Sequence, residues 1–351
     1  MKLKKTMAVC LVLAATLICT MTTVAQKDSV YRVAEIGTKQ LRGEVLKTTP
    51  IEVTIETRNG QEKVPASEIK KVTFSGEPRN LNRARDHFDG NRFNDCLQTI
   101  QKIDGEPKSQ MIKQEMDFLS AYSSAQMALR GDRAITTKSA EQILAGFIQD
   151  NSNSYRLVLA IDAYAQLLMA NGKIELAQKQ FNKLTKSRWP KYVARGHFFE
   201  GENLVHANQL DAAAKSYRAL SGLVTSDAET EQFKQLARCQ MAKLAALQGD
   251  VSRAVSTVED IIKNENAENS RLFAYAYNAL GTCYLQSNET KKACRAFLHT
   301  ELLFSSEPDA HAEALYNLAK IWPKLKELER ANRARELLSS RYRNSIWASK
   351  L

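Results

Sequence analysis

Three side chains that can bind metal ions lie close together in the sequence. His197, Glu200 and His206 carry the imidazole and carboxylate groups that ligate zinc and related cations. On one helix, however, His197 and His206 are nine positions apart, which turns them about 180° away from each other. They cannot share a face of that helix, so we expect no metal site there.

The remaining residues show no motif of an enzyme. The chain has no glycine loop of the phosphate-binding kind and no nucleophile elbow. Glu259 and Asp260 are adjacent, but neighbours in a helix point about 100° apart, which does not suit an acid–base pair. We therefore expect no cofactor and no metal, and a catalytic function is the least favoured class.

The cysteines do not suggest a redox or zinc motif either. Cys96, Cys239, Cys283 and Cys294 follow the N-terminal apolar segment, and no two form a CxxC pair. Cys283 and Cys294 lie on adjacent predicted helices, but Cys283 is two positions from Gly281, which faces the second helix. Two positions turn its side chain about 200° away. We expect free, largely buried thiols.

Pairs of small residues twelve positions apart indicate the elements that position these side chains. The offset is constant, while the interval between successive pairs varies. Two antiparallel helices joined by a short turn of fixed length behave in this way, because only a small residue allows close approach where they cross. The pattern predicts a mainly α fold, an α-solenoid of about seven helix-turn-helix repeats. The pairs are Ala84/Cys96, Ala128/Ala140, Ala165/Ala177, Gly201/Ala213, Ala242/Ala254, Gly281/Ala293 and Ala319/Ala331.

Other residues agree with this register. A large apolar residue usually follows the second small residue by four positions, as at Phe181 and Phe297, which places it on the same helical face. Pro323 should end or kink its helix near Trp322. Gly or Asn, which tolerate the left-handed conformation at a helix end, follow the first small residue by seven positions in four copies, and two glycines serve slightly out of phase. The former are Gly172, Asn208, Gly249 and Asn288, and the latter are Gly90 and Gly131.

The repeats resemble the tetratricopeptide repeat (TPR) family over about residues 80–345. The copy that matches best contains Tyr277, Leu280, Gly281, Tyr284, Ala293 and Phe297. The resemblance implies a concave groove built by the first helices, with exposed side chains about three positions before and one after the first small residue. It implies binding of a protein or peptide there. The candidate groove residues are Asp162, Gln166, Phe198, Glu202, Cys239, Lys243, Asn278, Thr282, Tyr316 and Lys320.

This mixed set departs from the family's pattern for a peptide C-terminal carboxylate, which uses repeated Lys, Arg and Asn. That binding mode is therefore not expected. After the last repeat, Tyr342, Ser345 and Trp347 look like the tail of a helical array in bacterial envelope proteins of this repeat type.

Residues 26–76 have a different pattern. Ile51, Val53 and Ile55 alternate with polar residues, Asn59-Gly60 is a hairpin turn signal, and about five short strands fit in the segment. The order of strands resembles an Sm-like or SH3-like domain and predicts a small five-stranded β-barrel, a module for interaction or oligomerisation. Residues 77–351 then form the TPR-like array.

Residues 1–25 have the features of a signal peptide. A basic start at Lys2, Lys4 and Lys5 precedes an uncharged, largely apolar stretch, and Thr23-Val24-Ala25 fits a cleavage site near Ala25. An uncleaved membrane anchor is the alternative. We expect export to the periplasm or cell envelope, which makes nucleic acid a poor partner despite a net charge of +11. The basic C-terminal part leaves peripheral membrane contact open.

These observations predict an exported, non-enzymatic scaffold that binds a protein or peptide partner of the cell envelope through the concave face. Two alternatives remain from the sequence. The protein is an assembly factor for the envelope or outer membrane, or the β-barrel forms oligomers with the helical array as a spacer.

Overall fold

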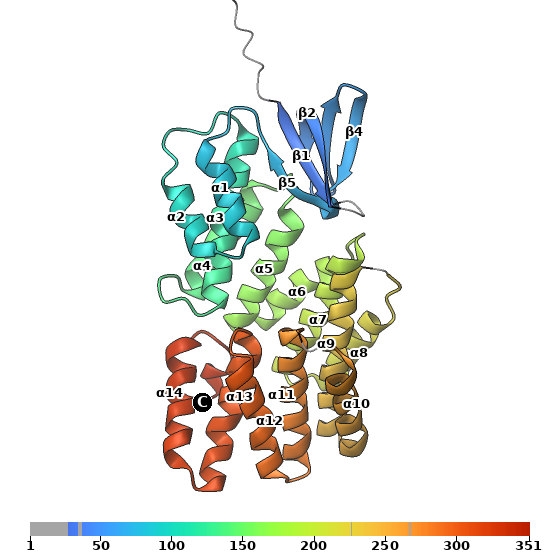
Figure 1. The fold of residues 1–351 in the computed structure, drawn as a ribbon, viewed down its shortest axis with the longest axis vertical. Helices are drawn as coiled ribbons and strands as arrows, with labels where there is room; N and C mark the ends of the chain where they lie inside the picture. Colours follow the sequence, from blue (N-terminus) through green and yellow to red (C-terminus); the bar gives the residue numbers. More distant parts are fainter. Residues whose placement is uncertain (1–26, 34–36, 226, 267) are drawn as a thin grey trace, which may run out of the picture.

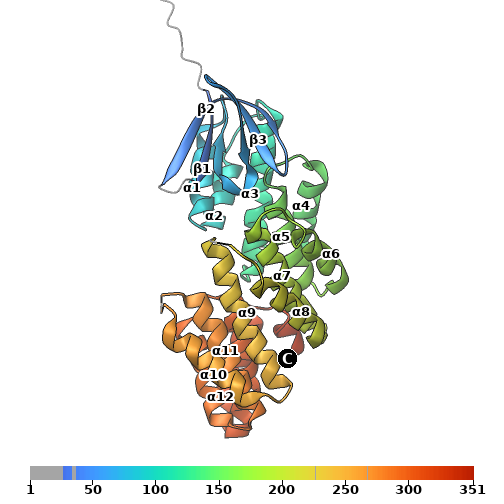
Figure 2. The ribbon, with the colours of Figure 1, turned by 90° about the vertical axis from the view of Figure 1, so that its right-hand side faces the viewer.

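The computed structural model describes residues 27–33, 37–225, 227–266 and 268–351, so the predicted signal peptide at residues 1–25 lies outside the described residues. A small β-sheet precedes a long array of helices, and the predicted α-solenoid is confirmed. The array curves, so that its last helices lie beneath the first four on the same side of the molecule in Figure 1, and Figure 2 shows the sheet at one end of the molecule. No helix in the described ranges is long and apolar enough to span a bilayer.

Fourteen α-helices in these ranges form seven consecutive hairpins, and each of the seven small-residue pairs lies across one hairpin. The helices are α1 Arg79–Asp89, α2 Phe93–Gln101, α3 Gln110–Leu129, α4 Thr137–Asp150, α5 Leu157–Ala170, α6 Ile174–Leu184, α7 Pro190–His206, α8 Leu210–Ser221, α9 Ala228–Leu247, α10 Val251–Asn264, α11 Ser270–Gln286, α12 Thr290–Leu303, α13 Pro308–Ile321 and α14 Leu328–Arg341.

The small residues make room for large side chains of the opposite helix. A Cβ atom added at Gly201 would lie 2.4 Å from the ring of Tyr217, and one added at Gly281 would lie 2.7 Å from the ring of Phe297. Both rings are fully buried. Each ring belongs to the residue four positions after the second small residue of its pair. In these two hairpins, the small residue of the first helix therefore lies where a ring of the second helix packs against the helix backbone.

A left-handed residue follows the first helix of all seven hairpins. In the second hairpin it is the predicted Gly131, three positions after Ala128, with φ 79°. In the other six it lies seven positions after the first small residue. Four are the predicted turn residues. The other two are Asn91 and Lys326, with φ of 56° and 64°. The prediction of Gly90 for this role was wrong, because Gly90 has φ −83° and the left-handed residue is its neighbour Asn91. As predicted from Pro323, α13 ends at Ile321 and continues as one 3₁₀ turn, Trp322–Leu325.

The N-terminal sheet is antiparallel and five-stranded, in the order β4-β3-β2-β1-β5. The prediction of a closed barrel was wrong, because the described strands leave β4 and β5 at opposite edges. The apolar face of the sheet packs against Leu81, Ile112 and Phe118 of the first hairpins rather than around a lumen of its own. The strands are β1 Asp28–Val33, β2 Thr38–Thr48, β3 Glu52–Thr57, β4 Gly60–Pro65 and β5 Ile69–Thr73.

A buried ionic network joins the sheet to the array. Arg85 on α1 donates two hydrogen bonds to Glu77, which follows the sheet, and a third to Glu115 on α3. Glu115 also accepts from Arg156 and from the Tyr155 hydroxyl, at 3.1 and 2.8 Å. Since Arg85 is 1% and Glu115 2% exposed, this network fixes the entry of the chain into the first hairpin.

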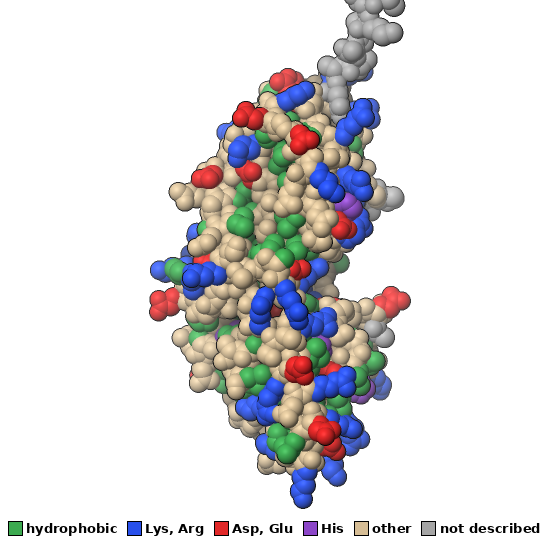
Figure 3. Space-filling view, turned by 90° about the vertical axis from the view of Figure 1, so that its left-hand side faces the viewer, with side chains coloured by type: hydrophobic (Ala, Val, Ile, Leu, Met, Phe, Trp, Pro, Cys, Tyr) green, Lys and Arg blue, Asp and Glu red, His purple; other side chains and the backbone are tan. Residues whose placement is uncertain are grey.

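The C-terminal end of the array contacts its second hairpin. The Arg343 side chain, just after α14, donates to the Arg133 carbonyl in the α3–α4 connection. Gly131 in the same connection lies against the end of α14, where an added Cβ would be 2.1 Å from the Arg341 carbonyl oxygen. The last hairpin therefore closes the curve of the array onto its second hairpin. Figure 3 shows Lys and Arg side chains gathered midway along this side of the molecule.

Candidate functional site

The concave side of the array holds a partly open cavity of about 340 Å³. Its walls come from the first helices of five hairpins, α3, α5, α7, α11 and α13, and from the segment after α14. The resemblance to TPR proteins places the concave groove on these same first helices. The polar and aromatic side chains that line it include Tyr122, Gln166, Arg195, Glu202, His206, Arg271, Tyr275, Glu313 and Trp347.

One wall of the cavity carries a carboxyl group whose pKa is raised. Glu202 on α7 accepts hydrogen bonds from the Tyr217 hydroxyl and from the Gln240 amide, both at 2.6 Å. Burial raises the pKa of Glu202 to about 7, against the opposing effects of the Tyr217 bond and the nearby Lys243. The site thus holds a carboxyl that changes charge near neutral pH.

One turn along α7, His206 is held neutral. Burial, reinforced by Lys350 and Lys243, lowers the pKa of His206 to about 3. Its Nδ1 atom is buried and has no hydrogen-bond partner among the described residues. A neutral imidazole with a free ring nitrogen can pack against an aromatic ring or accept a hydrogen bond from a ligand.

An ion pair links two hairpins across the concave side. Lys243 on α9 pairs with Glu313 on α13, and Glu313 also accepts from the Asn278 amide at 3.3 Å. Asn278 donates in addition to the Ala310 carbonyl at 2.8 Å. These contacts connect α9, α11 and α13 into one polar wall.

Five of the ten candidate groove residues lie in or beside this cavity. Gln166 and Glu202 line it directly. Lys243 and Asn278 lie beside it, because both contact the carboxylate of the cavity-lining Glu313. Tyr316 lies beside it because its ring centroid is 5.3 Å from that of Trp347.

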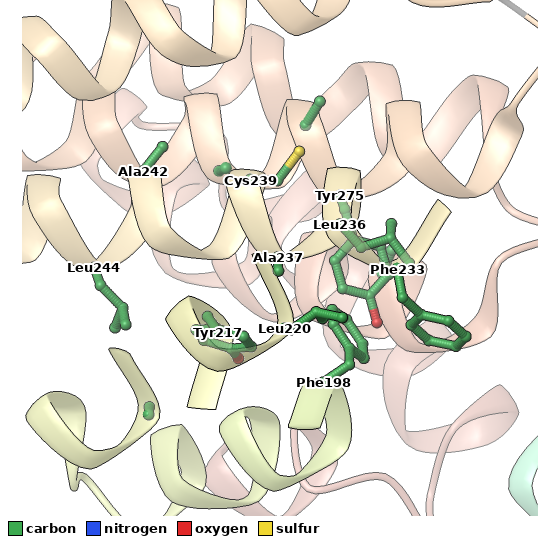
Figure 4. Packing of buried hydrophobic residues seen from close by; sticks show 14 of the residues in the cluster. Phe198, Tyr217, Leu220, Phe233, Leu236, Ala237, Cys239, Ala242, Leu244 and Tyr275 are labelled. Carbon is green, nitrogen blue, oxygen red and sulfur yellow. The ribbon is translucent and has the colours of Figure 1, made fainter. Parts of the chain in front are cut away.

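Four of the other candidates lie between helices. Phe198 is fully buried among the rings of Phe233, Tyr275 and others, as Figure 4 shows. Cys239 is fully buried in the same cluster, and burial raises the pKa of its thiol to about 12. Asp162 is buried in a salt bridge with Arg195.

Thr282, also buried, donates to the Asn278 carbonyl at 3.0 Å, which satisfies it within its own helix. Lys320, in contrast, is exposed and lies over the ring of Tyr316, 5.0 Å from its centroid. Neither side chain lines the cavity.

The structure adds site residues that the repeat pattern missed. Tyr122, Arg195, Tyr275 and Glu313 all line the cavity, and each lies six positions before the first small residue of its hairpin. That shared register is a signal that the sequence contains. The segment after α14 also lines the cavity, and no register of the repeats could place it there.

The site combines charged, polar and aromatic groups. Carboxylates, guanidinium groups and aromatic rings from separate helices converge on one hollow. Within the described ranges, no group of three or more His, Cys, Asp or Glu side chains is placed to hold a metal ion. The four described cysteines are buried free thiols.

No protein-family model and no curated protein matches the sequence. Solved structures match the fold. The apo form of RapI has a TM-score of 0.54 at 14% identity, over 76% of this chain and 97% of its own. A Rap protein complexed with competence and sporulation factor has a TM-score of 0.51 at 15% identity, over 77% of each chain.

A tetratricopeptide repeat protein from Parabacteroides merdae ATCC 43184 matches with a TM-score of 0.49 at 13% identity, over 75% of this chain and 91% of its own. The seven hairpins with their fixed internal register and the matches above a TM-score of 0.5 agree on one architecture. The chain has the TPR-type helical fold, preceded by an open five-stranded sheet.

Proposed function

We propose that this chain is a non-enzymatic scaffold that binds a protein or peptide on the concave face of its array. The observation that carries the proposal is the cavity itself, because five separate hairpins place polar and aromatic side chains around it. A preformed surface of this kind binds through many modest contacts with little ordering cost. The complex of a similarly folded Rap protein with competence and sporulation factor supports the use of this fold for binding.

Capture of partners tests the groove. A variant with Lys243→Ala and Tyr316→Ala should lose partners that the unchanged chain captures from envelope extracts. Lys243 and Tyr316 contact the cavity-lining Glu313 and Trp347. The matched control carries Lys291→Ala and Tyr284→Ala, the same residue types away from those two side chains, since the Tyr284 hydroxyl bonds Glu259 on α10. Equal capture by all three proteins would contradict a binding role for the concave face.

We further propose that the chain acts in the periplasm or cell envelope. The basic, apolar and small-residue pattern of residues 1–25 supports export. The mass of the protein from a fractionated native host tests this, since cleavage near Ala25 removes the segment. An intact mass in the membrane fraction would favour the anchored alternative, and an intact mass in the cytoplasm would contradict export.

The open sheet supports a second, distinct role as an oligomerisation module. Its order leaves β4 and β5 as edge strands, and edge strands present unpaired backbone groups to other chains. Light scattering of the purified chain tests this role. We expect a mass above that of the monomer that falls when Gln61 or Lys63 on β4 is replaced by Pro, which cannot donate to a neighbouring strand.

A further inference from the structure

We infer that the concave cavity contains a binding site for an aromatic side chain of a peptide, and that the segment 343–351 of this same chain occupies that site. The inference rests on the proposed function and specifies its ligand. In the structure, Trp347 is the side chain that fills the site.

The surroundings of Trp347 form a defined ring site. His206 from α7 presents its ring at 77° to the indole, with the centroids 5.9 Å apart. Tyr316 from α13 lies 5.3 Å away, and the Lys243 ammonium on α9 lies 5.7 Å from the indole centroid. Three hairpins thus converge on one ring, and a cation over its face favours the electron-rich indole.

The segment is attached to this site by few polar contacts. Its backbone hydrogen bonds are internal turns, such as Ser345 N–H to the Tyr342 carbonyl and Ala348 N–H to the Ser345 carbonyl. The bond from Arg343 to the Arg133 carbonyl, at 3.3 Å, joins it to the array. The buried Asn344 Nδ2 has no partner among the described residues, so one donor is left unsatisfied.

Burial of the side chains also changes just after the end of α14. Tyr342 is 3% exposed, and its hydroxyl lies 2.6 Å from His311 Nδ1. From Arg343 onward, each residue is partly or fully exposed. The firmly packed array therefore ends at Tyr342, and the following segment lies on the concave face as a separate peptide would. An external peptide with an aromatic residue can then compete for the same contacts.

The probe for this inference is a synthetic peptide with the sequence of residues 343–351, capped at both ends and labelled for fluorescence anisotropy. The full chain carrying Trp347→Ala should bind it at least about tenfold more tightly than the unchanged chain, whose site is already filled. The same peptide with Ala in place of its Trp should not bind. Adding Tyr316→Ala to Trp347→Ala should abolish binding of the original peptide.

A second variant guards against misfolding of the first. Arg343→Ala removes the bond to Arg133 from an exposed position and leaves the ring site intact, so it should also increase peptide affinity. Equal affinity of all folded variants, or no binding to any of them, would overturn the inference and make the segment a permanent cap.

The two proposals fail in different ways. If the peptide binds as expected but partner capture does not depend on Lys243 and Tyr316, the ring site is supported and the proposed function is contradicted. If partner capture depends on these residues but no variant binds the peptide, only the inference of an occupied ring site is contradicted.

Discussion

Two buried glutamates have pKa values shifted in opposite directions, and the reason is the charge that each one faces. Glu115 is buried between Arg85 and Arg156, whose positive charges outweigh the desolvation and lower its pKa from 4.5 to about 2. Glu202 accepts from a hydroxyl and an amide, and burial raises its pKa to about 7. The ionised carboxylate of Glu115 thus stabilises the fold, whereas ionisation of Glu202 lowers its stability.

Glu115→Gln should therefore destabilise the fold at pH 7 by about 3–5 kcal/mol, because the buried Arg156 loses the carboxylate with which it is paired and the buried Arg85 keeps only Glu77. The folded-state pKa lies below the unfolded value, so the carboxylate stabilises above pH 4.5. That contribution, on the order of 3 kcal/mol, is lost as the pH falls toward about 2.

Urea unfolding at pH 7 and pH 3 measures both effects. The unchanged chain should lose more stability between these values than Glu115→Gln does. Glu106→Gln, at an exposed loop position, is the control and should behave as the unchanged chain. A Glu115→Gln protein as stable as that control at pH 7 would refute the structural role of the network.

Glu202→Gln should have the opposite effect. The folded-state pKa of about 7 lies above the usual 4.5, so ionisation of this group weakens the fold as the pH rises from about 4.5 through 7. At pH 8 the variant should be more stable than the unchanged chain by about 1–3 kcal/mol, and the difference should shrink at pH 5. Urea titrations at the two pH values test this, and a variant that is less stable at pH 8 contradicts it.

At the scale of the hairpin, regular spacing made most of the fold predictable. The offset of twelve located all seven hairpins, because each copy repeats one backbone crossing. The left-handed turn at Lys326 was missed, since lysine has no preference for that conformation and only its position, seven after Ala319, indicates it. Similarly, the open sheet could not be told from a barrel by strand order alone.

The candidate site was predictable only in part, and helical geometry explains the difference. Cavity-lining positions lie six and two before, and one and five after, the first small residue, as for Tyr122, Phe199, Gln166 and His206. At about 100° per residue, the position three before the first small residue lies about 70° from the centre of the cavity-lining face of the helix. The position one after that residue lies about 30° from the centre. The former therefore points between helices, as Phe198 does.

The crossing of one hairpin can be tested with a matched pair of glycines. Gly281→Ala should destabilise the fold by about 1–3 kcal/mol, since its Cβ would be 2.7 Å from the Phe297 ring. Gly146→Ala on α4 meets no atom within 4 Å and should be neutral or stabilising by about 0.5–1 kcal/mol.

In a Phe297→Leu background, Gly281→Ala should cost less, which would show that the two sites are coupled. Thermal and urea unfolding provide the measurement. Equal effects of the two glycine substitutions would mean that close approach at the crossing does not matter for stability.

For the whole molecule, closure of the array could not be inferred from the sequence. The contact between Arg343 and Arg133 spans 210 positions, and no repeat register reaches so far. Closure depends on small rotations between successive hairpins, each set by loop lengths and side-chain volumes, which accumulate along a solenoid. The left-handed turn residue at this contact is Gly131, which departs from the turn register of the other six hairpins.

Gly131 also permits a test of closure. Gly131→Ala and Gly172→Ala place a Cβ on backbones of the same left-handed kind, with φ of 79° and 71°, so both should lose about 1 kcal/mol to backbone strain. Only at Gly131 does the new atom meet the far end of the array, 2.1 Å from the Arg341 carbonyl oxygen. Small-angle scattering should therefore show a larger radius of gyration for Gly131→Ala alone, with the segment 343–351 more rapidly cut by trypsin. Identical scattering from the two variants would mean that the last hairpin yields locally and that closure does not depend on this contact.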